Sequence, residues 1–234
     1  MGDALSIVVP VHNEAGFLPV ALPRLVDEIR ALDHPVELLL VENGSTDDTA
    51  AAAEALLEGL PVAGTVLSLP EPDYGAALAA GMKAAGGDLV AMFDIDYFSG
   101  RFVAEAVRAD ADVVIASKRA EGSDDRRSVL RRTGTWGFNV LLRTLFGSEV
   151  GDTHGMKLFH RTVIDDLAGS VRHTKDLFDT ELVLRAERAG YRIVELPVVV
   201  EEQRDARSSF VKRIPRTLRG LAEIRADFRT EGLL

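Results

Sequence analysis

Two carboxylates separated by a single residue, Asp94 and Asp96, directly follow an apolar run that ends at Phe93. Carboxylates this close repel each other unless a cation lies between them, and the nearest basic residues along the chain are Lys83 and Arg101. Hard divalent ions such as Mg²⁺ and Mn²⁺ take oxygen ligands and often bridge carboxylates to substrate phosphates. The pair is interpreted either as a metal site or as a solvated acidic turn.

Acidic and amide side chains also follow two other apolar runs. Glu14 comes just after residues 5–11, while Glu42 and Asn43 follow the run at residues 36–41. The Glu42 carboxylate could accept a hydrogen bond from a nucleobase N–H. A structural alternative is a turn at Asn43-Gly44, with Ser45 and Asp48 as a capping box that opens the next helix.

These acids are positioned by apolar runs that alternate with helical patterns. Such alternation predicts βαβ units and a mainly parallel sheet with helices on both faces, in which ligands bind at the carboxyl ends of the strands. The loops that carry Glu14, Glu42 and Asp94 therefore converge. We expect strands at 5–11, 36–41, 62–69, 89–93, 112–116 and 191–200, and helices at 17–32, 76–85, 103–107, 129–145, 179–189 and 213–229. Between them, residues 122–125 suggest a mobile tip.

Composition limits the classes of function. The 234 residues are 47% hydrophobic with a net charge of −10, and they include no cysteine, which excludes a disulfide framework, a zinc–thiolate site and a thiol nucleophile. Residues 1–100 hold 3 basic and 16 acidic side chains, which argues against nucleic acid as the main partner. No apolar run approaches the ~20 residues of a membrane span. We therefore expect a cytoplasmic protein that reaches a membrane through its surface or through a partner.

The second part of the chain is richer in cations and has two further acids of interest. Asp152 and Asp179 are candidates for a general base, with helix capping as the structural alternative. Arginines cluster in two segments and could bind a phosphate by bidentate hydrogen bonds, although charge runs are often only solvated surface. The candidates are Arg119, Arg131, Arg132, Arg204 and Arg207. The last helical pattern is amphipathic and basic, which suits a membrane surface, its own domain or a second copy of the chain.

Several segments in order resemble the family-2 glycosyltransferases of the GT-A fold, and most of all the branch of dolichyl- and polyprenyl-phosphate sugar transferases. The resemblance covers roughly residues 4–210 and rests on the order of its motifs, because each is weak alone. They are Val8-Val9-Pro10-Val11-His12-Asn13-Glu14, Val41-Glu42-Asn43-Gly44-Ser45-Thr46-Asp47, Tyr74-Gly75, Gly87-Asp88, Asp94-Ile95-Asp96, Asp152-Thr153-His154-Gly155-Met156-Lys157 and Phe178-Asp179-Thr180-Glu181-Leu182.

This resemblance implies a GT-A domain at 1–210, with a nucleotide-binding part at 1–117 and an acceptor part at 118–210, followed by a helical appendage at 211–234. It implies that Asp94 and Asp96 hold Mg²⁺ or Mn²⁺ on the diphosphate of the donor. The residues expected around the nucleotide are Pro10, Val11, Glu14, Glu42, Asn43, Gly75 and Asp94. The chain departs from the family at Glu42-Asn43 and at Tyr97-Phe98, which leaves the base preference and a third protein ligand open.

The implied reaction is metal-dependent, inverting transfer of a hexose from a GDP- or UDP-linked sugar. The favoured acceptor is a polyprenyl phosphate at the membrane face, because a phosphate is already anionic and needs cations rather than a strong base. The alternatives are a soluble hydroxyl acceptor or a non-catalytic nucleotide-sugar binding module. A dinucleotide oxidoreductase is excluded by the lack of G-x-G-x-x-G after the first strand. A homodimer remains a further expectation.

Overall fold

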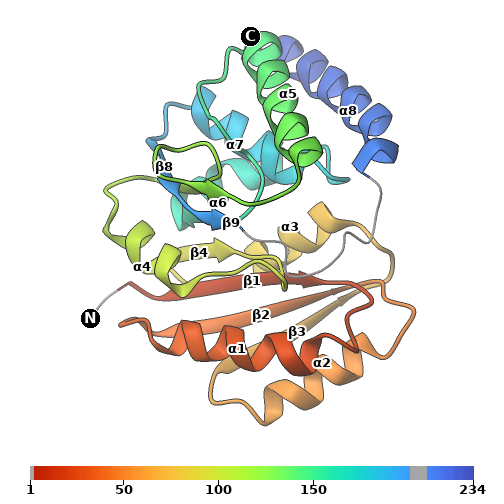
Figure 1. Cartoon of the computed structure of the whole chain (residues 1–234), viewed down its shortest axis with the longest axis vertical. Coiled ribbons are helices and arrows are strands. Elements are labelled where there is room, and N and C mark those ends of the chain that lie inside the picture. The colour runs from red at the N-terminus through yellow and green to blue at the C-terminus, as the bar shows by residue number, and fades with distance from the viewer. Residues whose placement is uncertain (1–2, 201–209) are drawn as a thin grey trace.

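The computed structural model describes residues 3–200 and 210–234 and is built on a seven-stranded sheet in the order β3-β2-β1-β4-β7-β5-β8 (Figure 1). All strand pairs are parallel except those of β7, which runs antiparallel to both β4 and β5. The predicted α/β architecture with a mainly parallel sheet is confirmed. The insertion of β7 between β4 and β5 brings residues of the second part of the chain next to the strand that precedes Asp94.

The strands of the large sheet are β1 (Leu5–Val11), β2 (Val36–Asn43), β3 (Ala63–Leu69), β4 (Leu89–Met92), β5 (Val113–Ser117), β7 (Lys157–His160) and β8 (Ile193–Pro197). A separate parallel pair is formed by β6 (Asp124–Asp125) and β9 (Val199–Val200). The α-helices are α1 (Leu18–Arg30), α2 (Thr49–Glu58), α3 (Tyr74–Ala84), α4 (Gly100–Arg108), α5 (Val129–Phe146), α6 (Arg161–Leu167), α7 (Phe178–Arg188) and α8 (Phe210–Thr230). A short 3₁₀ helix, η1 (Ala168–Ser170), follows α6.

Helices cover both faces of the sheet, as the burial of its central strands requires. Every residue of β1 and β4 is buried. One core cluster joins the sheet to α1, α2 and α4, and a second joins it to α3, α6 and α7. Burial of apolar side chains on both faces is the main stabilising contribution to such a sheet. The loops at the carboxyl ends of β1, β2 and β4 are therefore held by a rigid scaffold.

A third cluster forms away from the sheet, between α5, α7 and α8. Leu221, Ile224 and Phe228 of α8 are fully buried in it, and the ring of Phe228 lies 5.7 Å from that of Phe146 on α5. Figure 1 shows α8 lying alongside α5. The helix that the sequence sets apart as residues 211–234 thus shares a core with the acceptor part.

Local structure differs from the sequence-based expectation in three places. The segment expected as a mobile tip contains β6, whose Asp124 and Asp125 pair with Val199 and Val200. The strand expected at 191–200 is divided into β8 and β9, and α6 was not expected at all. Ser45 does not cap a helix: α2 begins at Thr49, and the Ser45 hydroxyl accepts a hydrogen bond from the backbone N–H of Asn13 at 3.0 Å.

Candidate active site

The carboxyl ends of β1, β2 and β4 bring the expected nucleotide-binding residues together. Pro10 pairs with Val41, and Val11 pairs with Glu42 across the β1–β2 register. The backbone N–H of Phe93 donates to the Val8 carbonyl at 3.0 Å, so that Asp94 follows at the same edge of the sheet. Ligands of open α/β sheets bind at this edge.

The loop after β2 is built by the two residues that the sequence singled out. Glu42 and Asn43 are each 6% exposed. The Glu42 carboxylate accepts the backbone N–H of Ser45, and Asn43 Oδ1 accepts the backbone N–H of Asp73 at 2.7 Å. Gly44, which follows Asn43, has φ +60, and a Cβ there would lie 2.5 Å from the backbone carbonyl carbon of Glu71. Both side chains thus shape this loop, and their contact with a nucleobase stays a prediction.

Glu14 links the first loop to the second. It is 5% exposed, its backbone N–H donates to Thr49 Oγ1 at 2.7 Å, and its carbonyl accepts from Phe17 and Leu18 at the start of α1. The neighbouring Asn13 has φ 53 and accepts the backbone N–H of Thr46 on its side-chain oxygen at 2.8 Å. The loops after β1 and β2 therefore form one hydrogen-bonded unit.

The acidic pair lies on a tight turn after β4. The backbone N–H of Tyr97 donates to the Asp94 carbonyl at 2.9 Å, which closes the turn around Asp96. Desolvation by the surrounding protein atoms and the charge of Asp96 raise the pKa of Asp94. Tyr74, the first residue of α3, donates its hydroxyl to Asp94 Oδ1 at 2.9 Å. The same surroundings, together with Asp94, raise the pKa of Tyr74 well above its usual value, so the phenol stays a proton donor.

This geometry fits a divalent cation. The two carboxylates supply only oxygen donors. Burial and the charge of Asp96 raise the pKa of Asp94, and a cation between the carboxylates would favour its ionised form. Within residues 3–200 and 210–234, no group of three or more acidic, histidine or cysteine side chains is arranged to hold a metal by itself. A cation here would therefore take its remaining ligands from water and from the substrate, as Mg²⁺ commonly does with phosphates.

Gly75 has a packing role, and its expected contact with the nucleotide stays a prediction. Its α-carbon is buried, and a Cβ would lie 2.0 Å from the carbonyl oxygen of Thr174 and 2.5 Å from Phe178 Cβ. Only glycine permits this approach, which sets the start of α3 and so the position of Tyr74. Asp73 caps α3 by accepting the backbone N–H of Ala76 at 3.0 Å and also accepts the Thr174 hydroxyl at 2.7 Å.

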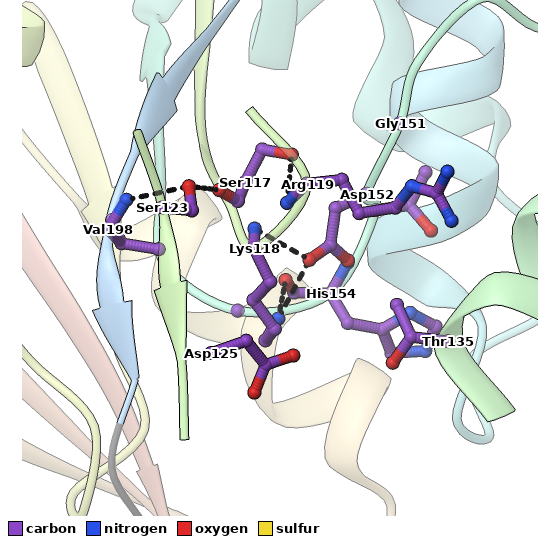
Figure 2. Close-up of polar contacts among 12 residues, drawn as sticks. Ser117, Lys118, Arg119, Ser123, Asp125, Thr135, Gly151, Asp152, His154 and Val198 are labelled. Carbon is purple, nitrogen blue, oxygen red and sulfur yellow. Dashed lines mark hydrogen bonds and ion pairs between the residues drawn. The ribbon is translucent and has the colours of Figure 1, made fainter. Parts of the chain in front are cut away.

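The two acids that the sequence suggested as general bases are both held by lysines. Asp152 is 1% exposed, and its carboxylate accepts from Lys118 Nζ at 2.9 Å and from the backbone N–H of His154 at 3.0 Å (Figure 2). Burial alone would raise the pKa of Asp152, but Lys118 and His154 together outweigh it through their charges and hydrogen bonds, and the pKa is lowered. Asp179 accepts from Lys157 Nζ at 2.8 Å, and Lys157 is fully buried. Each acid therefore holds a lysine side chain in place, and a general-base role for either one stays a prediction.

A basic pocket opens next to the Lys118–Asp152 pair. Its volume is about 270 Å³, and it is lined by Lys118, Arg119, Ser123, Asp125, Arg132 and Thr135. Among the described residues, Arg119 and Arg132 make no ion pair, whereas Asp125 is neutralised by Arg127 at 2.7 Å. The Ser123 side of the wall is held in place, because Ser123 Oγ donates to the Ser117 carbonyl at 2.7 Å and accepts from the backbone N–H of Val198 at 3.1 Å (Figure 2).

The structure thus unites part of the predicted arginine cluster. Arg119 and Arg132 share the pocket, Arg131 is not part of its lining, and Arg204 and Arg207 lie outside the described residues. Sequence reasoning missed Lys118, Lys157 and the Tyr74 hydroxyl as site groups. A weak signal existed for the lysines, because each stands directly after or at the start of an apolar strand segment.

Comparison with known proteins decides the family. A model described as glycosyl transferase family 2 matches residues 6–168. The chain belongs to this family. It is therefore a glycosyltransferase, an enzyme whose structure contains both the carboxylate pair and the basic pocket.

Two relatives show how similar this glycosyltransferase is to known members of the family. Undecaprenyl-phosphate 4-deoxy-4-formamido-L-arabinose transferase of Sodalis glossinidius is 32% identical over 222 residues, covering 91% of this chain but 65% of that protein. An uncharacterized glycosyltransferase of Mycobacterium bovis is 34% identical over 202 residues, covering 84% of this chain and 85% of the other. The chain therefore spans less than two thirds of the length of the first relative.

Two solved structures share the GT-A fold. Glucosyl-3-phosphoglycerate synthase of Mycobacterium tuberculosis, solved with Mn²⁺, UDP-glucose and phosphoglyceric acid, has a TM-score of 0.70 at 22% identity and covers 96% of this chain and 80% of its own. The mannosyltransferase PcManGT of Pyrobaculum calidifontis, solved with GDP-mannose and Mn²⁺, has a TM-score of 0.65 at 24% identity, covering 92% of this chain and 61% of its own. These likenesses confirm the predicted fold.

Proposed function

We propose that this glycosyltransferase moves a hexose from a nucleoside diphosphate sugar to a polyprenyl phosphate at a membrane surface, with inversion at the anomeric carbon. The observation that carries the proposal is the basic pocket, in which Arg119 and Arg132 make no ion pair with any residue that the structure describes. Guanidinium groups bind phosphate by paired hydrogen bonds, which suits an anionic acceptor. The names of the relatives that transfer sugars to undecaprenyl phosphate agree with this acceptor.

On the donor side, Asp94 and Asp96 would hold Mg²⁺ or Mn²⁺, which would neutralise charge on the departing nucleoside diphosphate. Tyr74 fixes one oxygen of Asp94 through its hydroxyl. The loops that carry Glu14, Glu42 and Asn43 would bind the base and ribose. The Mn²⁺ complexes with GDP- and UDP-sugars of the solved neighbours support this assignment.

On the acceptor side, Lys118, Arg119 and Arg132 would orient the phosphate so that an oxygen attacks the anomeric carbon opposite the leaving group. A phosphate monoester is already ionised near neutral pH, its second pKa being about 6, so no strong base is required. This agrees with the buried ion pairs of Asp152 and Asp179, in which each carboxylate contacts a lysine ammonium.

The helix that supplies Arg132 and Thr135 to the pocket also exposes apolar side chains. On α5, Val129, Leu130, Trp136 and Val140 are 75%, 62%, 56% and 40% exposed. On the adjacent α8, Ile214 and Leu218 are 39% and 46% exposed. We name these six residues the apolar face; arginines beside it on both helices suit anionic lipid headgroups. Among the described helices, none has the length and apolarity of a bilayer span.

A transfer assay tests the proposal. The purified protein is given GDP- and UDP-hexoses with Mn²⁺, and either citronellyl phosphate, citronellol or 3-phosphoglycerate as acceptor. Product is expected only from citronellyl phosphate, with the anomeric configuration of the donor inverted in the NMR spectrum, and it should be lost with EDTA or in Asp96→Ala. Transfer to citronellol or to 3-phosphoglycerate at an equal rate would contradict the polyprenyl phosphate acceptor.

A further inference from the structure

The hydroxyl group of Tyr97 is buried and has no hydrogen-bond partner among the residues that the structure describes. Buried polar side-chain atoms in folded proteins are nearly always hydrogen-bonded, so such an exception calls for a specific reason. Burial of the aromatic ring is explained by packing, because the ring lies against the core cluster that includes α1 and α4. A phenylalanine would do the same, and the hydroxyl is therefore not explained by packing.

Tyr97 lies between the two halves of the site. On one side it closes the turn that carries Asp94 and Asp96. On the other, a Cβ built on Gly155 would lie 3.3 Å from Tyr97 Cε1 and 3.2 Å from Lys118 Nζ. Since Cε1 is bonded to the carbon that bears the hydroxyl, the polar end of the ring and the Lys118 ammonium lie against the same glycine.

The charged groups around this hydroxyl belong mainly to the acceptor side. Burial raises the pKa of Tyr97, and the charges of Asp152 and Arg127 act on the phenol ahead of those of Asp94 and Asp125. Asp152 holds Lys118, Arg127 holds Asp125, and Lys118 and Asp125 both line the basic pocket. The hydroxyl therefore lies behind the wall of the pocket that the proposed function assigns to a phosphate.

We infer that Tyr97 is an acceptor-binding residue whose hydroxyl donates a hydrogen bond to the anionic phosphate held in the basic pocket. The inference rests on the proposed function, because it needs an anion in that pocket. The oxygen is covered in the structure, so the phosphate reaches it when the wall rearranges. A shift of Lys118 toward the phosphate with its Asp152 contact kept would provide that movement, since an ammonium has three donors and only two are used by Asp152 and the His154 carbonyl.

The test compares Tyr97→Phe with the wild type and with Tyr191→Phe, a matched control whose hydroxyl contacts Asp166 on α6. A hydrogen bond to a charged group contributes enough that its loss should raise the KM for citronellyl phosphate about tenfold. The KM for the sugar nucleotide should stay within about twofold. The unfolding temperature should stay equal or rise, because the variant removes an unpaired buried hydroxyl.

An unchanged KM for citronellyl phosphate in Tyr97→Phe, or a shift confined to the KM for the sugar nucleotide, would overturn the inference. Arg119→Ala separates this failure from that of the proposed function. If Arg119→Ala weakens binding of citronellyl phosphate by calorimetry and Tyr97→Phe does not, the pocket stands and the role of Tyr97 fails. If the wild-type protein does not bind citronellyl phosphate at all, the acceptor pocket fails and the role of Tyr97 fails with it.

Discussion

Lys118 and Asp152 are 34 residues apart in sequence, yet the ammonium of one lies 2.9 Å from the carboxylate of the other. The pair joins the end of β5 to the loop before β7, and the side chains are 8% and 1% exposed. The lysine also donates to the His154 carbonyl at 2.9 Å. An ammonium group that would otherwise be mobile is thereby fixed in the wall of the basic pocket.

Replacing Asp152 by Asn should destabilise the protein by about 3 kcal/mol at pH 7, because it leaves the Lys118 charge buried without its partner. The lowered pKa of Asp152 means that its contribution is present above the unfolded value of about 3.9 and is lost as pH falls through the lower folded value. The difference in the free energy of unfolding between wild type and variant should therefore shrink as the pH falls below about 3.9. Urea unfolding at pH 7 and at pH 3 measures both effects.

The control for this prediction is Asp124→Asn. Asp124 pairs with Arg126, but these side chains are 51% and 56% exposed, and an exposed pair contributes little. A loss of stability as large as that of Asp152→Asn would show that the substitution itself, rather than the buried pair, is responsible.

Tyr74→Phe should weaken the binding of Mn²⁺ in the presence of GDP or UDP by about fivefold, because Asp94 loses the hydrogen bond that orients it. Electron paramagnetic resonance of free Mn²⁺ measures this affinity without turnover. Tyr191→Phe should leave the affinity unchanged. Equal Mn²⁺ binding by Tyr74→Phe and wild type would show that the Asp94 carboxylate needs no such support.

Gly75→Ala should cost about 3 kcal/mol of stability, since the new methyl group overlaps the Thr174 carbonyl, a backbone atom with little freedom to shift. It should also move the start of α3, and with it the Tyr74 hydroxyl. Gly16→Ala is the matched control, because a Cβ there meets no atom within 4 Å. Comparable unfolding midpoints for the two variants would contradict the close packing at Gly75.

The sequence predicted the sheet and the convergence of the loops that carry Glu14, Glu42 and Asp94, since both depend on local patterns. Apolar runs place Glu14, Glu42 and Asp94 at strand ends whatever the order of the strands. The acceptor side depends on contacts between distant segments, which periodicity does not report. Nothing local indicates that Asp152 meets Lys118, or that β7 enters the sheet antiparallel beside β4. For the same reason β6, which exists only through its pairing with β9, was expected as a mobile tip.

The apolar face of α5 and α8 makes the membrane prediction testable at single residues. Trp136 is the only tryptophan in the chain and is 56% exposed, so its fluorescence should shift to the blue when vesicles of phosphatidylglycerol and phosphatidylcholine are added. Trp136→Ser and Leu218→Ser should each lower vesicle binding by about tenfold in sedimentation, because each removes apolar area from the contact. Added salt should weaken binding further by screening the nearby arginines from anionic lipid.

Val199→Ser is the control for this face, because Val199 is 62% exposed on β9 rather than on either helix. It should bind vesicles like the wild type. If the control loses as much binding as Trp136→Ser, the contact is not confined to α5 and α8. If the wild-type protein binds no anionic vesicles but transfers sugar to water-soluble citronellyl phosphate, the phosphate pocket acts without a membrane and the apolar face must serve another contact.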